Sequence, residues 1–445
     1  MNKNKDYLIT EKPSRALFAF ALPMIIGNLF QQAYTIVDSA IVGHYVGETA
    51  LAAVGASSAL TTIFICVAIG GGIGASVIIS QHFGGHAYSR MKTSIRTAML
   101  SFLLISLLLG GIGLCFSRQI MEALNTPADA MDIAVIYLNI YFYGLPFLFM
   151  YNILSSMFNA LGESRIPLYL LIFSSVLNIF LDLYMVATLH LGVAGAAYAT
   201  FIAQGISAVC SFLIFLHTLR RLDGKAETWF SKAEFSSMSR IALPSILQQS
   251  TVSIGMMLVQ SVVNGFGTQI LAGFSAGMRI ESLCVVPMAA IGNALSSYTA
   301  QNIGAEKHER ISLGYRTANI MVAITAIILC LFLELLHRPL IALFLDGAPS
   351  AQTVATGEGY LRFFGFFFCM IGFKMAVDGI LRGAGAVKVF TIANLVNLGL
   401  RVLIAKLGAP VYGIAMIWYA VPLGWLANFL ISYGYYRTGK WKQIS

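Results

Sequence analysis

The chain has 445 residues, of which 58% are hydrophobic and only 11% are charged, whereas about a quarter of a typical soluble chain is charged. Because this deficit extends along the whole length, the composition excludes a soluble domain with one anchor and indicates an all-α integral membrane protein. The net charge of +9 does not indicate a nucleic-acid partner, since the basic residues lie in short loops between apolar segments and act as topology determinants.

Hydropathy predicts twelve transmembrane helices in two six-helix lobes, since twelve apolar segments reach the roughly 20 residues that a helix needs to cross a bilayer. Several segments are longer and are expected to tilt or to protrude. In chain order they cover 15–43, 50–82, 93–116, 131–157, 166–187, 193–216, 240–265, 269–301, 314–336, 357–381, 388–406 and 411–435.

The longest connection divides the chain in half. Its residues Trp229, Phe230 and Phe235 stand among charges, which is typical either of an interfacial helix or of a solvated connector. The predicted organisation is a cytoplasmic tail over 1–14, an N-lobe over 15–216, a cytoplasmic linker over 217–239, a C-lobe over 240–435 and a cytoplasmic tail over 436–445.

Lysine and arginine set the expected orientation. Of the 28 basic residues, 21 lie in the tails or in the loops on the side of the N-terminus, whereas only Arg118, Arg338 and Lys406 lie on the opposite side. Both termini are therefore predicted to be cytoplasmic, which requires an even number of helices.

The two halves of the chain repeat. Ala21-Leu22-Pro23 recurs as Ala242-Leu243-Pro244, and QHFGG at 81–85 matches QNIGA at 301–305, at an offset of 220 or 221 residues. Each half has six helices, so both halves enter the membrane in the same orientation and form parallel repeats. A cavity between two such lobes, opening alternately to each side, is the expected mechanism.

The first predicted helix combines two features that suit a transporter. Asp38 is a carboxylate within an apolar run, where a charge costs about 3 kcal/mol unless it faces a polar cavity or a partner. Pro23 removes a backbone hydrogen bond and permits a bend. The alternative is a structural kink with a carboxylate that a neighbouring helix neutralises.

Four oxygen-bearing side chains of the N-lobe are expected at a similar depth. Asp38 lies about six residues before the outer end of its helix, roughly 9 Å deep, and Asp182 lies about five residues before the outer end of its own. Asn178 shares a helix face with Asp182, and Thr200 lies about seven residues into the next helix. Such oxygens suit a hard cation such as Na⁺, and two neighbouring carboxylates favour proton uptake. The alternative is a structural hydrogen-bond network.

The C-half does not copy this set, since the repeat sets Arg401 against an N-half carboxylate. Arg401 is interpreted either as part of lobe packing or as an anchor for a carboxylate. Lys374 and Asp378 are four residues apart on one helix face and form either a neutralised structural pair or a second charged coupling site. Arg279 and Glu281 are two residues apart, and the sequence does not identify their partners.

Nothing in the sequence indicates an enzyme. The glycines of 70–74 lie inside an apolar segment without a GKS or GKT, so they indicate close helix packing and not a phosphate loop. The sequence contains no nucleotide-binding domain, catalytic triad or metalloprotease motif. No cofactor is expected beyond a coupling ion, H⁺ or Na⁺.

Aromatic residues are frequent in the segment 131–157, among them Tyr137 and Tyr141. Around a cavity they would accept flat, lipophilic cations by stacking and cation–π attraction. For any single one of them, contact with lipid or core is the ordinary alternative. The expected partners are lipophilic cations, the coupling cation and membrane lipids.

At these residues the chain resembles the multidrug and toxic compound extrusion (MATE) family, in particular its DinF-like prokaryotic branch. The resemblance covers about 15–435 and rests on twelve helices in two repeats, the ALP motif of each half and the VDSAIVGHYVG stretch. Its most specific part is the joint occurrence of Asp38, Asn178, Asp182 and Thr200. It implies that these four residues form the cation site of the N-lobe, holding Na⁺ if the transporter is sodium-coupled, and that the first helix bends at Pro23.

The resemblance also bears on the cavity and on the C-lobe. Other family members carry a glutamate where this chain has Val252, and Asp378 matches their acidic residue only loosely, so a C-lobe cation site of that type is not expected. The positions that match polar residues lining the N-lobe are Tyr34, Tyr137 and Asn152, and Gln31 is a further candidate cavity residue.

The sequence thus predicts a cation-coupled multidrug antiporter of the bacterial inner membrane, working as a monomer. A flippase for a lipid-linked precursor, from the same superfamily, is the alternative. It would need a more basic cavity than the four basic residues within apolar segments provide. A receptor or scaffold is disfavoured by the twofold repeat with its buried carboxylates.

Overall fold

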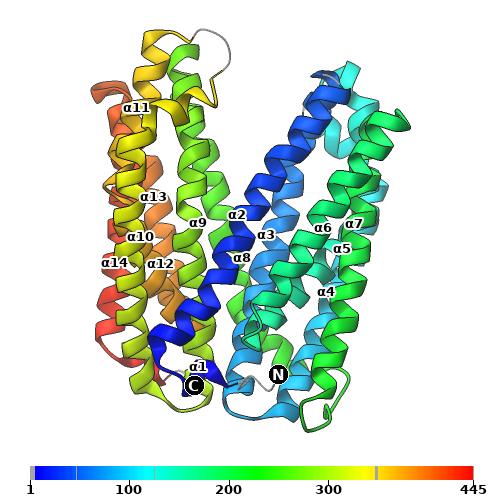
Figure 1. Cartoon of the computed structure of the whole chain (residues 1–445), viewed down its shortest axis with the longest axis vertical. Coiled ribbons are helices and arrows are strands. Elements are labelled where there is room, and N and C mark those ends of the chain that lie inside the picture. The colour runs from blue at the N-terminus through cyan, green and yellow to red at the C-terminus, as the bar shows by residue number, and fades with distance from the viewer. Residues whose placement is uncertain (1–5, 47, 125, 346–348, 444–445) are drawn as a thin grey trace. The chain divides into compact units, whose positions relative to one another are not determined.

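A computed structural model describes residues 6–46, 48–124, 126–345 and 349–443, and within these ranges the chain forms helices and no strand (Figure 1). The helices are α1 (Tyr7–Thr10), α2 (Pro13–Val46), α3 (Glu48–Gly84), α4 (Tyr88–Ala123), α5 (Ala128–Ala160), α6 (Arg165–Asp182), the π-helix η1 (Leu183–Thr188), α7 (Gly192–Arg220), α8 (Lys232–Asn264), α9 (Thr268–Gly304), α10 (His308–Ala342), α11 (Ala351–Gly365), α12 (Phe368–Gly383), α13 (Val387–Tyr412), α14 (Ala415–Arg437) and the 3₁₀-helix η2 (Lys440–Gln443).

The helices confirm the predicted fold class. In the described part of the chain, eleven helices are long and apolar enough to cross a membrane, and a bent pair makes the twelfth. That pair is α11 and α12, which meet at 51°, so the prediction of one continuous helix over 357–381 is wrong in this respect. Gly365 ends α11, and glycine is a weak helix former.

The connection between α7 and α8 is not an interfacial helix. Residues 221–231 contain turns and bends but no helix, and α8 begins at Lys232, earlier than the predicted start at 240. Of the two alternatives that the sequence left open, the connector is the one that the structure contains.

The chain divides into two compact units. One unit comprises the residues up to Ile25 together with those from Leu247 onward, and the other comprises Ile26–Ile246. Both boundaries lie inside helices, two residues after Pro23 in α2 and two residues after Pro244 in α8. The compact units therefore divide at other positions than the predicted lobes, which were separated at the linker.

The packing of the N-terminal parts of α2 and α8 explains these boundaries. Phe20 of α2 is fully buried in the same core as Phe274 of α9. In the other unit, Met238 of α8 belongs to the core that contains Phe83 and Phe158. The N-terminal part of α2 thus packs in the core of the unit that contains the C-half. The N-terminal part of α8 packs in the core of the unit that contains the N-half.

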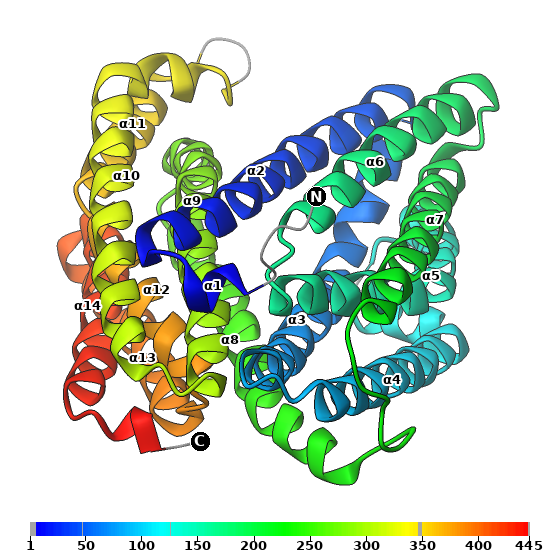
Figure 2. The same cartoon turned by 60° about the horizontal axis from the view of Figure 1, so that its bottom comes forward.

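Within the unit Ile26–Ile246, α5 packs against α3, α4 and α7, and α6 packs against α7 (Figure 2). The predicted close packing at the glycines of α3 is confirmed. A side-chain carbon at Gly74 would lie 2.6 Å from the carbonyl oxygen of Met238, which no real contact tolerates. Glycine at this position therefore allows α3 to approach the first turns of α8 backbone to backbone.

Candidate cation site in the first compact helix group

Four of the predicted site residues lie together in the unit Ile26–Ile246. Asp38 comes from α2, Asn178 and Asp182 come from α6, and Thr200 comes from α7. Tyr34 lies one helix turn before Asp38 and points to the same group. Asp182 and Asn178 are buried, at 0% and 2% exposure, so their polar atoms depend on partners within the protein.

Asn178 connects these residues. With its amide oriented as its neighbours require, the nitrogen donates to Tyr34 Oη at 2.7 Å and to Asp182 Oδ2 at 2.8 Å. The amide oxygen then accepts from Thr200 Oγ1 at 3.2 Å and from the Thr200 backbone N–H at 3.0 Å. One amide thus fixes the positions of α2, α6 and α7 relative to each other around the site.

The two carboxyl groups of the site lie close together. Asp38 and Asp182 are near enough to act directly on each other, and two such carboxyl groups can share a hydrogen bond only when a proton lies between them. Within the described residues, Oδ1 of each aspartate is also buried without a hydrogen-bond partner. Buried acceptors without donors are rare, so these two oxygens mark a place where positive charge would be stabilised.

The helix geometry changes at this site. Asp182 is the last residue of α6, and the π-helix η1 follows it directly. Short π-helical segments within membrane helices are frequent at functional sites, because they re-aim side chains relative to a regular helix.

The remaining predicted cavity residues divide into two groups. Tyr137 of α5 lies close enough to both aspartates for their charges to act on its hydroxyl group. It also lines a small cavity with Thr200 between α5 and α7. Gln31 is exposed on α2. The amide of Asn152 donates at 2.8 Å to the carbonyl oxygen of Leu148 in its own helix. The structure therefore brings Tyr34 and Tyr137 to the site but not Gln31 or Asn152.

The predicted C-half pair is formed. Lys374 Nζ lies 2.9 Å from Asp378 Oδ2, with both side chains almost fully buried. Asn394 Oδ1 accepts from Lys374 at 3.2 Å, and Ser432 Oγ donates to Asp378 Oδ1 at 2.9 Å. Each charge therefore has a second polar partner besides the other, which favours a neutralised structural pair.

Sequence reasoning missed a second polar group in the unit that contains the C-half. The hydroxyl of Tyr360 in α11 donates to Glu281 Oε2 in α9, and the charge of Arg401 in α13 acts on both. Arg401 thus lies near a carboxylate, the second of the two roles considered for it. The repeat carried a signal, because Tyr360 stands as many residues before Gly385 as Tyr137 stands before Gly162, and both glycines have positive φ.

The donors suit protons and hard cations, not transition metals. No group of three or more histidine, cysteine, aspartate or glutamate side chains converges within the described residues. Carboxylate, amide and hydroxyl oxygens of the N-half site are ligands that Na⁺ accepts, and two of these oxygens, Oδ1 of each aspartate, have no hydrogen-bond partner among the described residues.

A helical membrane protein whose two halves repeat in sequence has the organisation of many transporters. The MatE family model matches the chain twice, over residues 23–184 and 244–407. The chain therefore belongs to the MATE family of multidrug efflux transporters, and the double match coincides with its internal repeat.

Known relatives extend over nearly the whole chain. The probable multidrug resistance protein YpnP of Bacillus subtilis is 31% identical over 97% of this chain and 96% of its own length. A MATE family transporter of the MOP superfamily in an outward-facing conformation has a TM-score of 0.90 at 22% identity, with 100% of both chains covered. A MOP superfamily transporter from Pyrococcus furiosus has a TM-score of 0.91 at 22% identity, with 99% of both covered. These two structures support the fold.

Proposed function

We propose that this protein is a cation-coupled antiporter that exports lipophilic, mostly cationic compounds by alternating access. The observation that carries the proposal is that the buried carboxyl groups of Asp38 and Asp182 lie close together beside the network of Asn178, Tyr34 and Thr200. Membership in a family of multidrug efflux transporters supplies the direction of transport.

The coupling step is an exchange of positive charge at the two aspartates. When one proton lies between them, like-charge repulsion is relieved and α2 is held to α6. When the proton leaves, two buried carboxylates repel each other, and α2 and α6 separate unless another cation takes its place. A bound cation can bias the two states only if they differ in affinity for it, and we expect the state in which the two acids lie close together to be the one with the higher affinity.

H⁺ is the coupling ion that the close approach of the two acids favours, and Na⁺ is the second candidate because all the donors are oxygens. Pro23 supports the same mechanism. It lies inside α2 and leaves the carbonyl of residue 19 without its helical donor, so α2 can bend there when Asp38 changes partners.

The orientation and substrate class complete the proposal. Both termini lie in the cytoplasm of a bacterium whose inner membrane holds the chain, since 21 of the 28 basic residues are on that side. The monomer is the working unit.

Tyr34 and Tyr137 next to the acids present aromatic faces that attract organic cations, so substrate and coupling ion compete for one electronegative region.

The test is transport in proteoliposomes, with export of tetraphenylphosphonium driven separately by a pH gradient and by a sodium gradient. We expect Asp38→Asn and Asp182→Asn to abolish export while the proteins still elute as single, folded species. Asp132→Asn is the matched control, because Asp132 is an exposed acid that pairs with Arg118. Export at the wild-type rate by Asp38→Asn would refute the proposal, and export driven only by sodium would replace H⁺ by Na⁺.

A further inference from the structure

An apolar groove runs along the outside of the unit Ile26–Ile246. Its floor is α5, with Phe147, Met150 and Leu154, and its walls are α4 and α7, which both pack against α5. The groove has a volume of about 590 Å³. On this side of α4, Leu103 lines the groove and Leu107 follows it by one helix turn, and they are 37% and 53% exposed, as expected for a surface that faces lipid.

One end of the groove is basic. Arg96 of α4 and Trp229 of the linker line it there, with the guanidinium carbon 4.6 Å from the centre of the indole ring. After Arg96, α4 has no charged residue before Arg118, a distance of about 33 Å at 1.5 Å per residue. Since the hydrocarbon core is about 30 Å thick, Arg96 lies at one edge of it, on the side predicted to be cytoplasmic.

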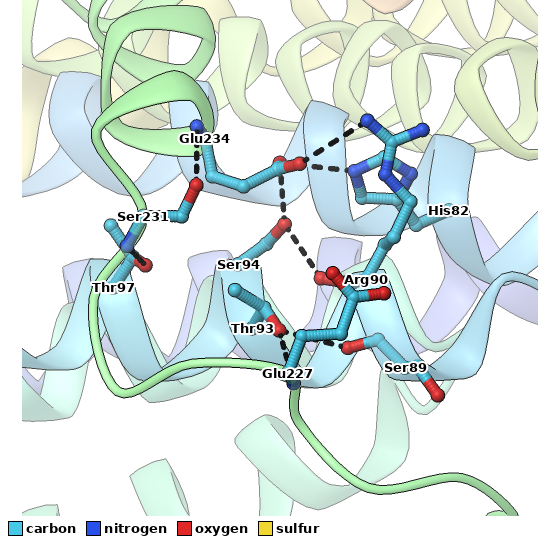
Figure 3. Close-up of polar contacts among 9 residues, drawn as sticks. All are labelled: His82, Ser89, Arg90, Thr93, Ser94, Thr97, Glu227, Ser231 and Glu234. Atoms are coloured by element: carbon cyan, nitrogen blue, oxygen red, sulfur yellow. Dashed lines mark hydrogen bonds and ion pairs between the residues drawn. The ribbon is translucent and has the colours of Figure 1, made fainter.

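The linker is pinned so that Trp229 covers Arg96. The backbone N–H of Glu227 donates to Thr93 Oγ1 at 3.0 Å, and the backbone N–H of Ser231 donates to Thr97 Oγ1 at 3.0 Å (Figure 3). Trp229 lies midway between these two anchors, and Arg96 lies between the two threonines. These two hydrogen bonds therefore hold the linker in place on α4 and position Trp229 over Arg96 at the end of the groove.

The neighbouring charges leave Arg96 available. Lys92 donates to the carbonyl oxygens of Leu222 and Gly224, at 2.6 Å and 2.8 Å, so its ammonium group is already bound to the backbone of the linker. In the described part of the chain no carboxylate lies within ion-pair distance of Arg96. Stacking on an aromatic face leaves the edge N–H groups of a guanidinium free, and these bind phosphate in a bidentate manner.

We propose that this groove binds one anionic phospholipid of the adjacent leaflet, with an acyl chain along α5 and the phosphate on Arg96. From Arg96 to Leu103 the α4 wall is about 10 Å long, most of the roughly 15 Å depth of one leaflet. Basic pockets between membrane helices bind anionic headgroups, and tryptophan lies at the headgroup level of bilayers. The lipid would hold α4, α5, α7 and the linker together. The proposal does not depend on ion-coupled export.

The internal repeat supplies a matched control. Arg316 stands where Arg96 stands in the first half, within the matching Arg-Thr-Ala sequence. The residue that matches Trp229 is Leu8, so no aromatic ring is provided there. Arg316→Gln removes the same charge from the same side of the membrane without touching the groove.

The experiment is native mass spectrometry of the full chain titrated with dioleoylphosphatidylglycerol or with dioleoylphosphatidylcholine. We expect the wild type to bind phosphatidylglycerol at least about tenfold more tightly. Arg96→Gln removes the preference and Arg316→Gln retains it. Val209→Trp fills the groove from an exposed position on α7 and lowers binding of both lipids, whereas Leu213→Trp, one turn along and outside the groove, leaves binding unchanged.

Three results would overturn the proposal. One is an unchanged preference in Arg96→Gln together with unchanged binding in Val209→Trp. Another is equal binding of both lipids by the wild type, which would leave a non-selective apolar surface. The third is displacement of phosphatidylglycerol by equimolar tetraphenylphosphonium from the wild type but not from Val209→Trp, which would assign the groove to exported cations. If Arg96→Gln does not fold, Trp229→Ala replaces it, with a severalfold weaker preference expected.

Discussion

The buried pair of Lys374 and Asp378 allows a structural role to be separated from a coupling role by measurement. The exposed fractions of the two side chains are 6% and 4%, so neither charge has access to bulk solvent. Removal of one partner from such a pair leaves an uncompensated buried charge and costs about 3–5 kcal/mol. We therefore expect Lys374→Met and Asp378→Asn each to lower the free energy of unfolding by about 4 kcal/mol.

Removal of both charges should cost much less than the sum of the single changes. The double variant Lys374→Met/Asp378→Asn retains a partner for Ser432 and removes both charges of the pair, and replacing a buried pair by neutral groups is often neutral or stabilising. The expected interaction energy in the double-mutant cycle is thus several kcal/mol. Unfolding by SDS in mixed micelles, followed by intrinsic fluorescence, measures all four proteins.

The same four proteins test function. Export by the double variant at a rate close to the wild type identifies a structural pair. Folded double variant without export would identify a second coupling site and contradict our interpretation of the contacts with Asn394 and Ser432. Single changes that cost less than about 1 kcal/mol and simply add would refute the energetic argument itself.

Two further changes probe the site and the linker. Tyr34→Phe removes the hydrogen bond to Asn178, worth about 1 kcal/mol, so initial rates of proton-driven export should fall roughly fivefold while elution as a folded species is unchanged. An unaltered rate would exclude Tyr34 from the network's function. Glu234→Ala leaves His82 and Ser94 without their shared acceptor, Oε2, which lies at 3.0 Å and 2.7 Å (Figure 3), so stability should fall by about 1–3 kcal/mol. Trypsin should then cut faster at Arg221 and Lys225, and equal cleavage rates would contradict this role of Glu234.

Depth along a helix could be predicted from the sequence, whereas the direction of side chains around it could not. Counting residues from the helix ends brought Asp38, Asp182 and Thr200 to one level, and the structure brings them together. The same counting gave no partner for Glu281, because Tyr360 and Arg401 come from helices far along the chain and their meeting depends on helix rotation. Gln31 shows the limit in the other direction, since it is polar and near the site in sequence but exposed on α2.

Backbone irregularities and linker contacts were also beyond the sequence. The break between α11 and α12 falls in an aromatic run around Gly365 that hydropathy treats as one apolar segment. Thr93 and Thr97 hold the linker through their hydroxyl oxygens, yet in the sequence they are ordinary polar residues at the start of a span. Their role follows only from the path that residues 227–231 take along α4.

The two halves of the repeat differ in whether their buried acids have basic residues nearby, and this difference supports cation coupling in the first half. In the unit with the C-half, Asp378 forms an ion pair with Lys374, and the charge of Arg401 acts on Glu281, so each acid has a fixed positive charge nearby. Among the described residues, no basic side chain acts on Asp38 or Asp182 of the N-half site. Such a site reaches neutrality only by taking up mobile cations, and a transporter that exchanges ions across a membrane requires a site of that kind.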